Sequence, residues 1–163
     1  MHWLTIEKLG PIQHCQLPIR QYTVLTGFQA AGKSTVAKAI YFFRTLKDDI
    51  YQLIQQQEYS ELIYGLKYAP RQEDAKQHTL YGFVRNKFLS TFGSSYSMDK
   101  AMRLCYQYSD NVEITISLAE SRNSLTPNFV WVEYSPCIRK FLSNSWPANN
   151  REALRRELDA LFD

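Results

Sequence analysis

Apolar and polar positions alternate along the first part of the chain in the manner of β-strands. Trp3–Ile6 and Ile12–Leu17 each have the two-residue period of a strand, and the pair Gly10-Pro11 between them predicts a turn. A further run, Tyr22–Thr26, is rich in β-branched and aromatic residues and predicts another strand. The chain is therefore expected to begin with three strands.

The period then changes to that of an amphipathic helix. Apolar residues recur with helical spacing from position 36 to position 54, so we expect one long helix from Lys33 to about Gln56. The pattern within Gln72–Leu89 is again more helical than not, and the glycine and serines of Phe92–Ser95 predict a loop after it.

The clearest strand pattern lies between residues 102 and 118, where two alternating segments flank Ser109-Asp110-Asn111. This arrangement predicts a β-hairpin with a three-residue loop, in which Asn111 takes the left-handed position. A slip of one residue would bury polar side chains, so the register is well specified. The predicted opposing pairs are Tyr108 with Val112, Tyr106 with Ile114, Leu104 with Ile116 and Met102 with Leu118.

Two more elements are expected near the C-terminal end of the sequence. Phe129–Val132 is an apolar run of strand length. Arg151–Phe162 predicts a last amphipathic helix, with an apolar stripe at Leu154, Leu158, Leu161 and Phe162.

The segment Gly27–Thr35 lies between Tyr22–Thr26 and the long helix and matches the phosphate-binding pattern G-x-x-x-x-G-K-[ST]. Its two glycines allow backbone angles and close approaches that a side chain would block, so that successive N–H groups at the helix start can face a polyphosphate. Lys33 is expected to reach the β- and γ-phosphates, and the Ser34 hydroxyl to bind Mg²⁺. The predicted ATP·Mg contacts are Gly27, Phe28, Gln29, Ala30, Ala31, Gly32, Lys33, Ser34 and Thr35.

Strand, phosphate loop and helix together predict the α/β class and a P-loop NTPase-type fold. We expect a mixed sheet that carries the phosphate loop at the carboxyl end of one strand, with the Lys33 helix packed on it. The 102–118 hairpin would form an antiparallel β region, with flanking helices. Residues 1–163 are enough for a single domain with its own core.

Charge and cysteine content narrow the function classes. The net charge of +3 is small, and basic residues occur singly or in short pairs, so DNA as a partner is unsupported by the charge pattern. Cys15, Cys105 and Cys137 are far apart and have no C-x-x-C spacing, which is typical of reduced thiols in a cytoplasmic protein rather than of a zinc site. No apolar run reaches membrane-spanning length, and no signal-peptide pattern is present.

An ATPase with this loop also needs an acidic residue at the end of an apolar strand, to position Mg²⁺ and polarise the attacking water. Two stretches have this form: Phe129–Val132 followed by Glu133, and Ile114–Ala119 followed by Glu120. Glu133 is the candidate catalytic acid beside Lys33, although a surface turn is the commoner setting for such a glutamate. No LSGGQ-like signature is present.

Taken with the loop, several segments resemble the heads of ABC/SMC-type ATPases, and especially the prokaryotic AAA-labelled ATP-binding proteins whose heads are ABC-like. The likeness is carried by Ile6–Ile12 in the hairpin ahead of the loop, by Val24–Gly27 and by Gly32–Lys38. Lys87–Gly93, followed by a tyrosine-rich hairpin, and Val130–Pro136 are similar to that group at lower specificity.

The resemblance implies that this chain is the N-terminal lobe of a longer head, because the signature and the Walker B acid come from a later part of such heads. It implies that ATP and Mg²⁺ bind at the loop, and that hydrolysis needs a C-terminal lobe or a partner. Two such heads sandwich two nucleotides, so a homo- or heterodimer is the implied assembly. The chain would then be an ATPase when completed by the missing motifs.

Two other functions remain open from the residues alone. Small P-loop metabolite kinases, such as gluconate and shikimate kinases, have a similar loop and a similar length. The two strands ahead of the loop and the lack of an arginine-rich lid disfavour such a phosphotransferase. The third hypothesis is a non-catalytic module that keeps nucleotide as a structural ligand.

Overall fold

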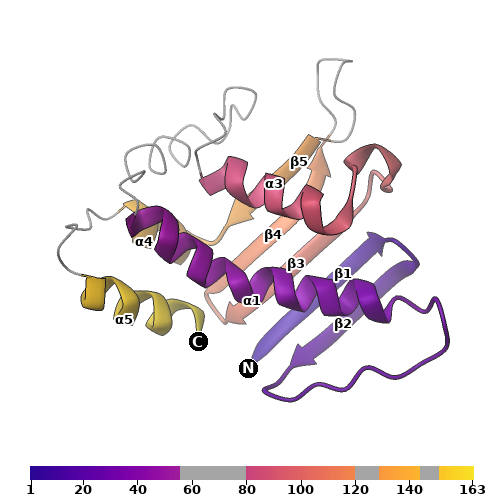
Figure 1. The fold of residues 1–163 in the computed structure, drawn as a ribbon, viewed down its shortest axis with the longest axis horizontal. Helices are drawn as coiled ribbons and strands as arrows, with labels where there is room; N and C mark the ends of the chain where they lie inside the picture. The colour runs from indigo at the N-terminus through magenta and orange to yellow at the C-terminus, as the bar shows by residue number, and fades with distance from the viewer. Residues whose placement is uncertain (56–79, 120–128, 144–150) are drawn as a thin grey trace.

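The computed structural model describes residues 1–55, 80–119, 129–143 and 151–163, and a five-stranded sheet lies at its centre (Figure 1). The strand order is β2-β1-β3-β4-β5, and every neighbouring pair is antiparallel. Tight turns join β1 to β2 and β3 to β4, a connection that only antiparallel neighbours permit. The strands are β1 (His2–Leu9), β2 (Ile12–Ile19), β3 (Arg103–Ser109), β4 (Val112–Ala119) and β5 (Phe129–Tyr134).

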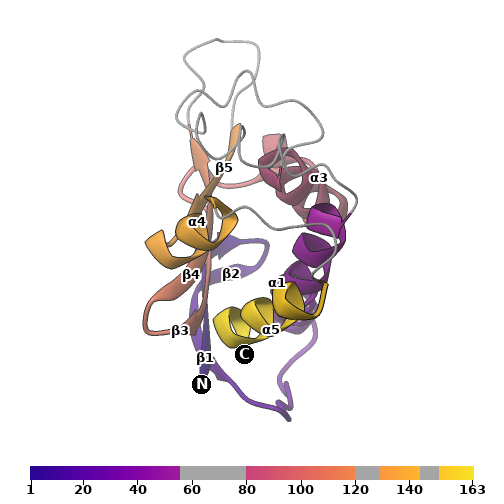
Figure 2. The ribbon, with the colours of Figure 1, turned by 90° about the vertical axis from the view of Figure 1, so that its left-hand side faces the viewer.

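The helices α1, α3 and α5 lie on the same side of this sheet, as Figure 2 shows. The longest, α1, has 23 residues and is therefore about 34 Å long. It begins beside the β1–β2 turn and runs across the sheet toward α5. The described helices are α1 (Lys33–Gln55), α3 (Leu80–Phe92), a 3₁₀ turn at Ser95–Ser97, α4 (Pro136–Ser143) and α5 (Arg151–Phe162).

The core lies between α1 and the sheet, because every second side chain of the central strands is apolar and points toward the helices. Leu4 and Ile6 of β1 are fully buried there, and each such side chain contributes about 1.5–3 kcal/mol to stability. The Phe43 ring of α1 stacks on Tyr106 with ring centroids 5.0 Å apart. The Tyr108 hydroxyl donates a hydrogen bond of 2.7 Å to the Phe43 carbonyl oxygen. These contacts fix the position of α1 on the sheet.

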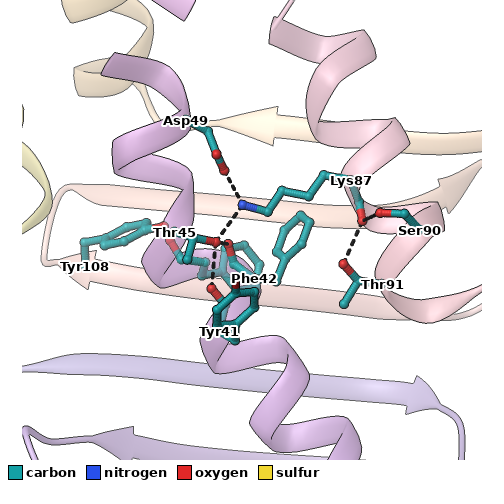
Figure 3. A network of polar contacts seen from close by, with 9 residues as sticks. Tyr41, Phe42, Thr45, Asp49, Lys87, Ser90, Thr91 and Tyr108 are labelled. Carbon is teal, nitrogen blue, oxygen red and sulfur yellow. Dashed lines mark hydrogen bonds and ion pairs between the residues drawn. The ribbon is translucent and has the colours of Figure 1, made fainter. Parts of the chain in front are cut away.

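A polar network then joins α1 to α3 (Figure 3). The Lys87 ammonium of α3 forms an ion pair with Asp49 of α1 and donates a hydrogen bond of 2.6 Å to the Thr45 hydroxyl. Its Nζ also lies 5.7 Å from the centre of the Phe42 ring. Because the Lys87 and Asp49 side chains are both less than one-third exposed, this pair is screened by water less than a surface ion pair. It holds α3 against α1.

The structure confirms the α/β class with flanking helices, but it corrects the expected mixed sheet. All strand pairs among the described residues are antiparallel. The predicted strand Tyr22–Thr26 is wrong, since that segment has no strand structure and leaves Tyr22 and Val24 more than four-fifths exposed. A high β propensity does not make a strand where no neighbouring strand completes the ladder. The phosphate loop therefore does not follow a strand of this sheet.

The hairpin prediction is confirmed in its core and wrong at its tip. Leu104 faces Ile116 and Tyr106 faces Ile114, as expected. Toward the turn the register shifts, so that Ser109 and not the preceding tyrosine pairs with Val112, and Asn111 does not take a positive φ. The irregularity absorbs one residue and shortens the turn. Met102 also lies just outside β3.

The helix predictions are confirmed over most of their length. The long helix begins at Lys33 as expected, and α5 has the predicted bounds. The expected Gln72–Leu89 helix is α3 from Leu80 onward, and its first eight positions lie outside the described residues. The α4 helix was missed, although its Ile138, Phe141 and Leu142 have helical spacing.

Candidate nucleotide-binding site

The Gly27–Thr35 segment forms a compact loop that leads directly into α1. Gly27 and Gly32 have φ angles of 147° and 89°, and Ala30 between them has a φ of 62°. Three positive φ angles within six residues make the backbone turn repeatedly and let N–H groups converge. Ala30 is the unusual member, because a left-handed conformation costs a residue with a Cβ about 1–2 kcal/mol.

The loop rests on the turn between β1 and β2. A Cβ atom placed on Gly32 would lie 2.6 Å from Cγ1 and 3.0 Å from Cδ1 of Ile12, and 3.4 Å from Cγ of Pro11. A Cβ atom on Gly10 would lie 3.5 Å from Oγ1 of Thr35. The hairpin turn therefore positions the loop, and Gly32 is required both for its backbone angle and for its close packing.

The start of α1 presents backbone donors beyond this loop. Val36 N donates a 3.0 Å hydrogen bond to the Gly32 carbonyl oxygen, which closes the first helical turn. The N–H groups of Gly32, Lys33, Ser34 and Thr35 then have no acceptor within the helix. No acidic residue occupies the first turn, so the positive end of the helix dipole is not compensated there. Such a helix start favours an anion.

Lys33 lies across the mouth of the loop. Its Nζ donates a hydrogen bond of 2.6 Å to the Gly27 carbonyl oxygen and another to that of Phe28. Both acceptors are neutral and solvent-facing, so phosphate oxygens can replace them with stronger charge-assisted bonds. These residues fit a polyphosphate. For Mg²⁺ the loop offers the exposed Ser34 hydroxyl.

The remaining predicted loop contacts differ in their surroundings. Gln29 and Ala31 are exposed, and the Phe28 side chain is 91% exposed and packs on little of the chain. Any contact from these three residues to a nucleotide would come through their backbone. Thr35 is partly buried beside the hairpin turn.

The structure does not bring Glu133 to the loop. Glu133 is an exposed residue of β5, the edge strand opposite β2, and it pairs with Thr115 on the sheet face turned away from α1. Its carboxylate accepts a 3.2 Å hydrogen bond from the Trp131 indole nitrogen. A role for Glu133 at a metal bound by Ser34 has no support in this arrangement. Glu120 lies outside the described residues.

Burial disfavours Cys15 and Cys105 as reactive centres. All three cysteines are free, and burial raises the pKa of the Cys15 and Cys105 thiols. A raised thiol pKa disfavours the nucleophilic thiolate. The described residues also contain no group of three or more His, Cys, Asp or Glu side chains that could hold a metal ion.

A pocket beside the loop was not anticipated from the sequence. It has a volume of about 380 Å³ and is lined by Thr35 and Lys38 of α1, by the β1–β2 turn and by residues that follow α3. No local motif marks it, because its walls meet only when β1 pairs with β3, about 100 positions later in the chain.

Comparisons of this chain with protein-family models, with curated proteins and with solved structures find no match. The ABC/SMC-like resemblance thus depends on the residues quoted for it. None of the described helices has the length and apolar character that a membrane crossing requires.

Proposed function

We propose that this chain is an ATP·Mg-binding lobe of an ABC/SMC-like ATPase, which hydrolyses ATP when a C-terminal lobe or a partner head completes its site. The observation that carries the proposal is the loop Gly27–Thr35, with its positive φ angles and its exit into the start of α1. In this proposal Lys33 binds the β- and γ-phosphates, and Ser34 supplies one ligand to Mg²⁺.

Two observations support the need for a partner. They are the position of the candidate catalytic acid and the exposed apolar segment ahead of the loop. Glu133, the candidate catalytic acid, lies on β5, at the edge of the sheet opposite β2. Tyr22 and Val24 are highly exposed in an apolar segment of β-type sequence, which is a surface suited to a strand of the completing lobe. Packing of the completing lobe on this segment would bury both side chains directly ahead of the phosphate loop.

The proposal is tested by calorimetric titration of the protein with Mg·ATP. Lys33→Ala removes a charged contact to phosphate worth about 1.5–3 kcal/mol, so the dissociation constant should rise about ten- to a hundredfold. Arg156→Ala is the matched control, because Arg156 is an exposed cation of α5. Figure 1 shows α5 near the end of α1 that is farther from the loop. This variant should bind as the wild type does. Equal affinities for the wild type and Lys33→Ala would refute the phosphate-loop assignment.

A turnover measurement distinguishes the alternatives. The lobe alone should bind ATP with little hydrolysis, whereas a metabolite kinase would transfer phosphate to one of a panel of small hydroxyl compounds. A non-catalytic module would lose thermal stability on Lys33→Ala and keep its partner binding. The two strands ahead of the loop favour the lobe over the kinase.

A further inference from the structure

The pocket beside the phosphate loop has a composition suited to an organic ligand group with polar edges. It combines apolar side chains, an aromatic ring, two lysines, an amide and one carboxylate, in a volume of about 380 Å³. Its floor is the first part of α1, and its far wall follows the end of α3. The residues that the argument uses are Lys8, Gln13, Thr35, Lys38, Phe92 and Asp99.

The place of Thr35 connects this pocket with the phosphate site. Thr35 belongs to the first turn of α1, whose N–H groups would face an anion on the loop, and it also lines the pocket. In a nucleotide the nucleoside is covalently attached to the α-phosphate. A nucleotide whose phosphates lie on the loop can therefore extend past Thr35 into the pocket.

The carboxylate of Asp99 is held in position by its own turn. Its Oδ1 accepts a 2.8 Å hydrogen bond from Ala101 N, and its carbonyl oxygen accepts one of 2.9 Å from Met102 N. The other oxygen, Oδ2, forms an ion pair with the Lys8 ammonium at 3.8 Å, a distance longer than a hydrogen bond. Asp99 thus presents an oriented acceptor at the pocket, as a ligand hydroxyl requires.

Phe92 and Gln13 supply the remaining recognition groups. The Phe92 ring is partly buried and packs on Phe88 with centroids 5.0 Å apart, so the ring is a fixed apolar wall. Gln13 is exposed and carries both a donor and an acceptor. The pocket has two lysines, Lys8 and Lys38, and one carboxylate, so its net charge is positive and suits an anionic ligand.

We propose that this pocket takes the nucleoside of a ribonucleotide and that the Asp99 carboxylate accepts hydrogen bonds from the ribose hydroxyls. The proposal rests on the proposed function, because it needs the phosphates to lie on the loop. It goes beyond that function in assigning nucleoside recognition to the segment between α3 and β3, which carries no phosphate-binding motif.

The test compares three ligands in the presence of Mg²⁺: ATP, 2′,3′-dideoxyATP and inorganic tripolyphosphate. Asp99→Asn keeps an oxygen for the Ala101 N–H but removes the charged acceptor. Asp110→Asn, in the exposed β3–β4 turn, is the control for the lost charge. Dissociation constants are measured by calorimetry, and far-UV circular dichroism verifies folding. Gln13→Ala is a second variant that leaves the Asp99 turn intact.

The wild type should bind ATP about tenfold more tightly than dideoxyATP, because a hydrogen bond to a charged group usually changes an affinity by about that factor. Asp99→Asn should weaken ATP by about the same factor and remove the difference between the two nucleotides. Its tripolyphosphate affinity should stay the same or rise, because a negative charge near the anion is gone. Gln13→Ala should weaken ATP several-fold without changing tripolyphosphate binding.

Equal wild-type affinities for ATP and dideoxyATP would overturn the assignment of Asp99. So would an Asp99→Asn variant that weakens ATP and tripolyphosphate alike. Either result, with Lys33-dependent tripolyphosphate binding intact, would leave the proposed function standing. A wild type that binds none of the three ligands would overturn the proposed function, and this inference with it.

Discussion

The substitution Gly32→Ala offers the most direct test of how the phosphate loop is built. Gly32 has a φ of 89°, and a Cβ atom there would lie 2.6 Å from Cγ1 of Ile12. The backbone conformation costs about 1–2 kcal/mol for a residue with a side chain, and forcing a methyl group into a packed contact costs about 1–3 kcal/mol more. We expect the free energy of unfolding to fall by about 3 kcal/mol.

Ile12→Ala separates these two costs. Alone it should destabilise by about 2–5 kcal/mol, because Ile12 is buried in the core. It also removes the two Ile12 atoms that the new methyl group would meet and leaves only the 3.4 Å approach to Cγ of Pro11. In the double variant the clash with Ile12 is gone, so the two substitutions should be less than additive by about 1–3 kcal/mol.

Urea unfolding followed by circular dichroism measures all four proteins of this cycle. The slope of unfolding free energy against urea should stay constant across them, which makes the midpoints comparable. A Gly32→Ala variant within 0.5 kcal/mol of the wild type (roughly the range of an inert surface change), or strict additivity with Ile12→Ala, would refute the packing of the loop on the hairpin turn.

Two further stability predictions follow from the loop and from the α1–α3 network. Ala30→Gly should raise the unfolding free energy by up to about 1 kcal/mol, because glycine adopts a φ of 62° without strain. Ala37→Gly, at an exposed site of α1, is the control. It should lower the unfolding free energy by about 1 kcal/mol in the same urea assay. Lys87→Met should cost about 1–3 kcal/mol, because it leaves the part-buried Asp49 carboxylate without its ion pair. Adding Asp49→Leu should recover part of that loss, and no recovery in thermal unfolding would mean that the pair itself contributes little.

Local patterns predicted the long helix and the centre of the hairpin, since both depend on residues close together in the sequence. The Lys33 start of α1 and the facing of Tyr106 and Ile114 follow from periodicity alone. Tyr22–Thr26 has strand-like residues too, but a strand also needs a hydrogen-bonding neighbour, and the sequence does not say whether one is present.

The loop Gly27–Thr35 could be singled out from the sequence because its motif lies in nine consecutive residues, and its phosphate binding stays a prediction. The pocket beside it could not be singled out, since Asp99 and Thr35 come together only through the pairing of β1 with β3. The separation of Glu133 from the loop also depends on how the strands pair. Strand order placed β5 at the edge opposite β2, and no local pattern encodes strand order.

The central place of β1 limits how the protein can be shortened for laboratory work. Residues His2–Leu9 pair with β2 on one side and with β3 on the other. Removing them would cut the sheet in two and separate the hairpin turn that supports Gly32 from the rest of the molecule. Affinity tags therefore belong ahead of β1, and a deletion from the N-terminal side removes β1 before it reaches the loop Gly27–Thr35.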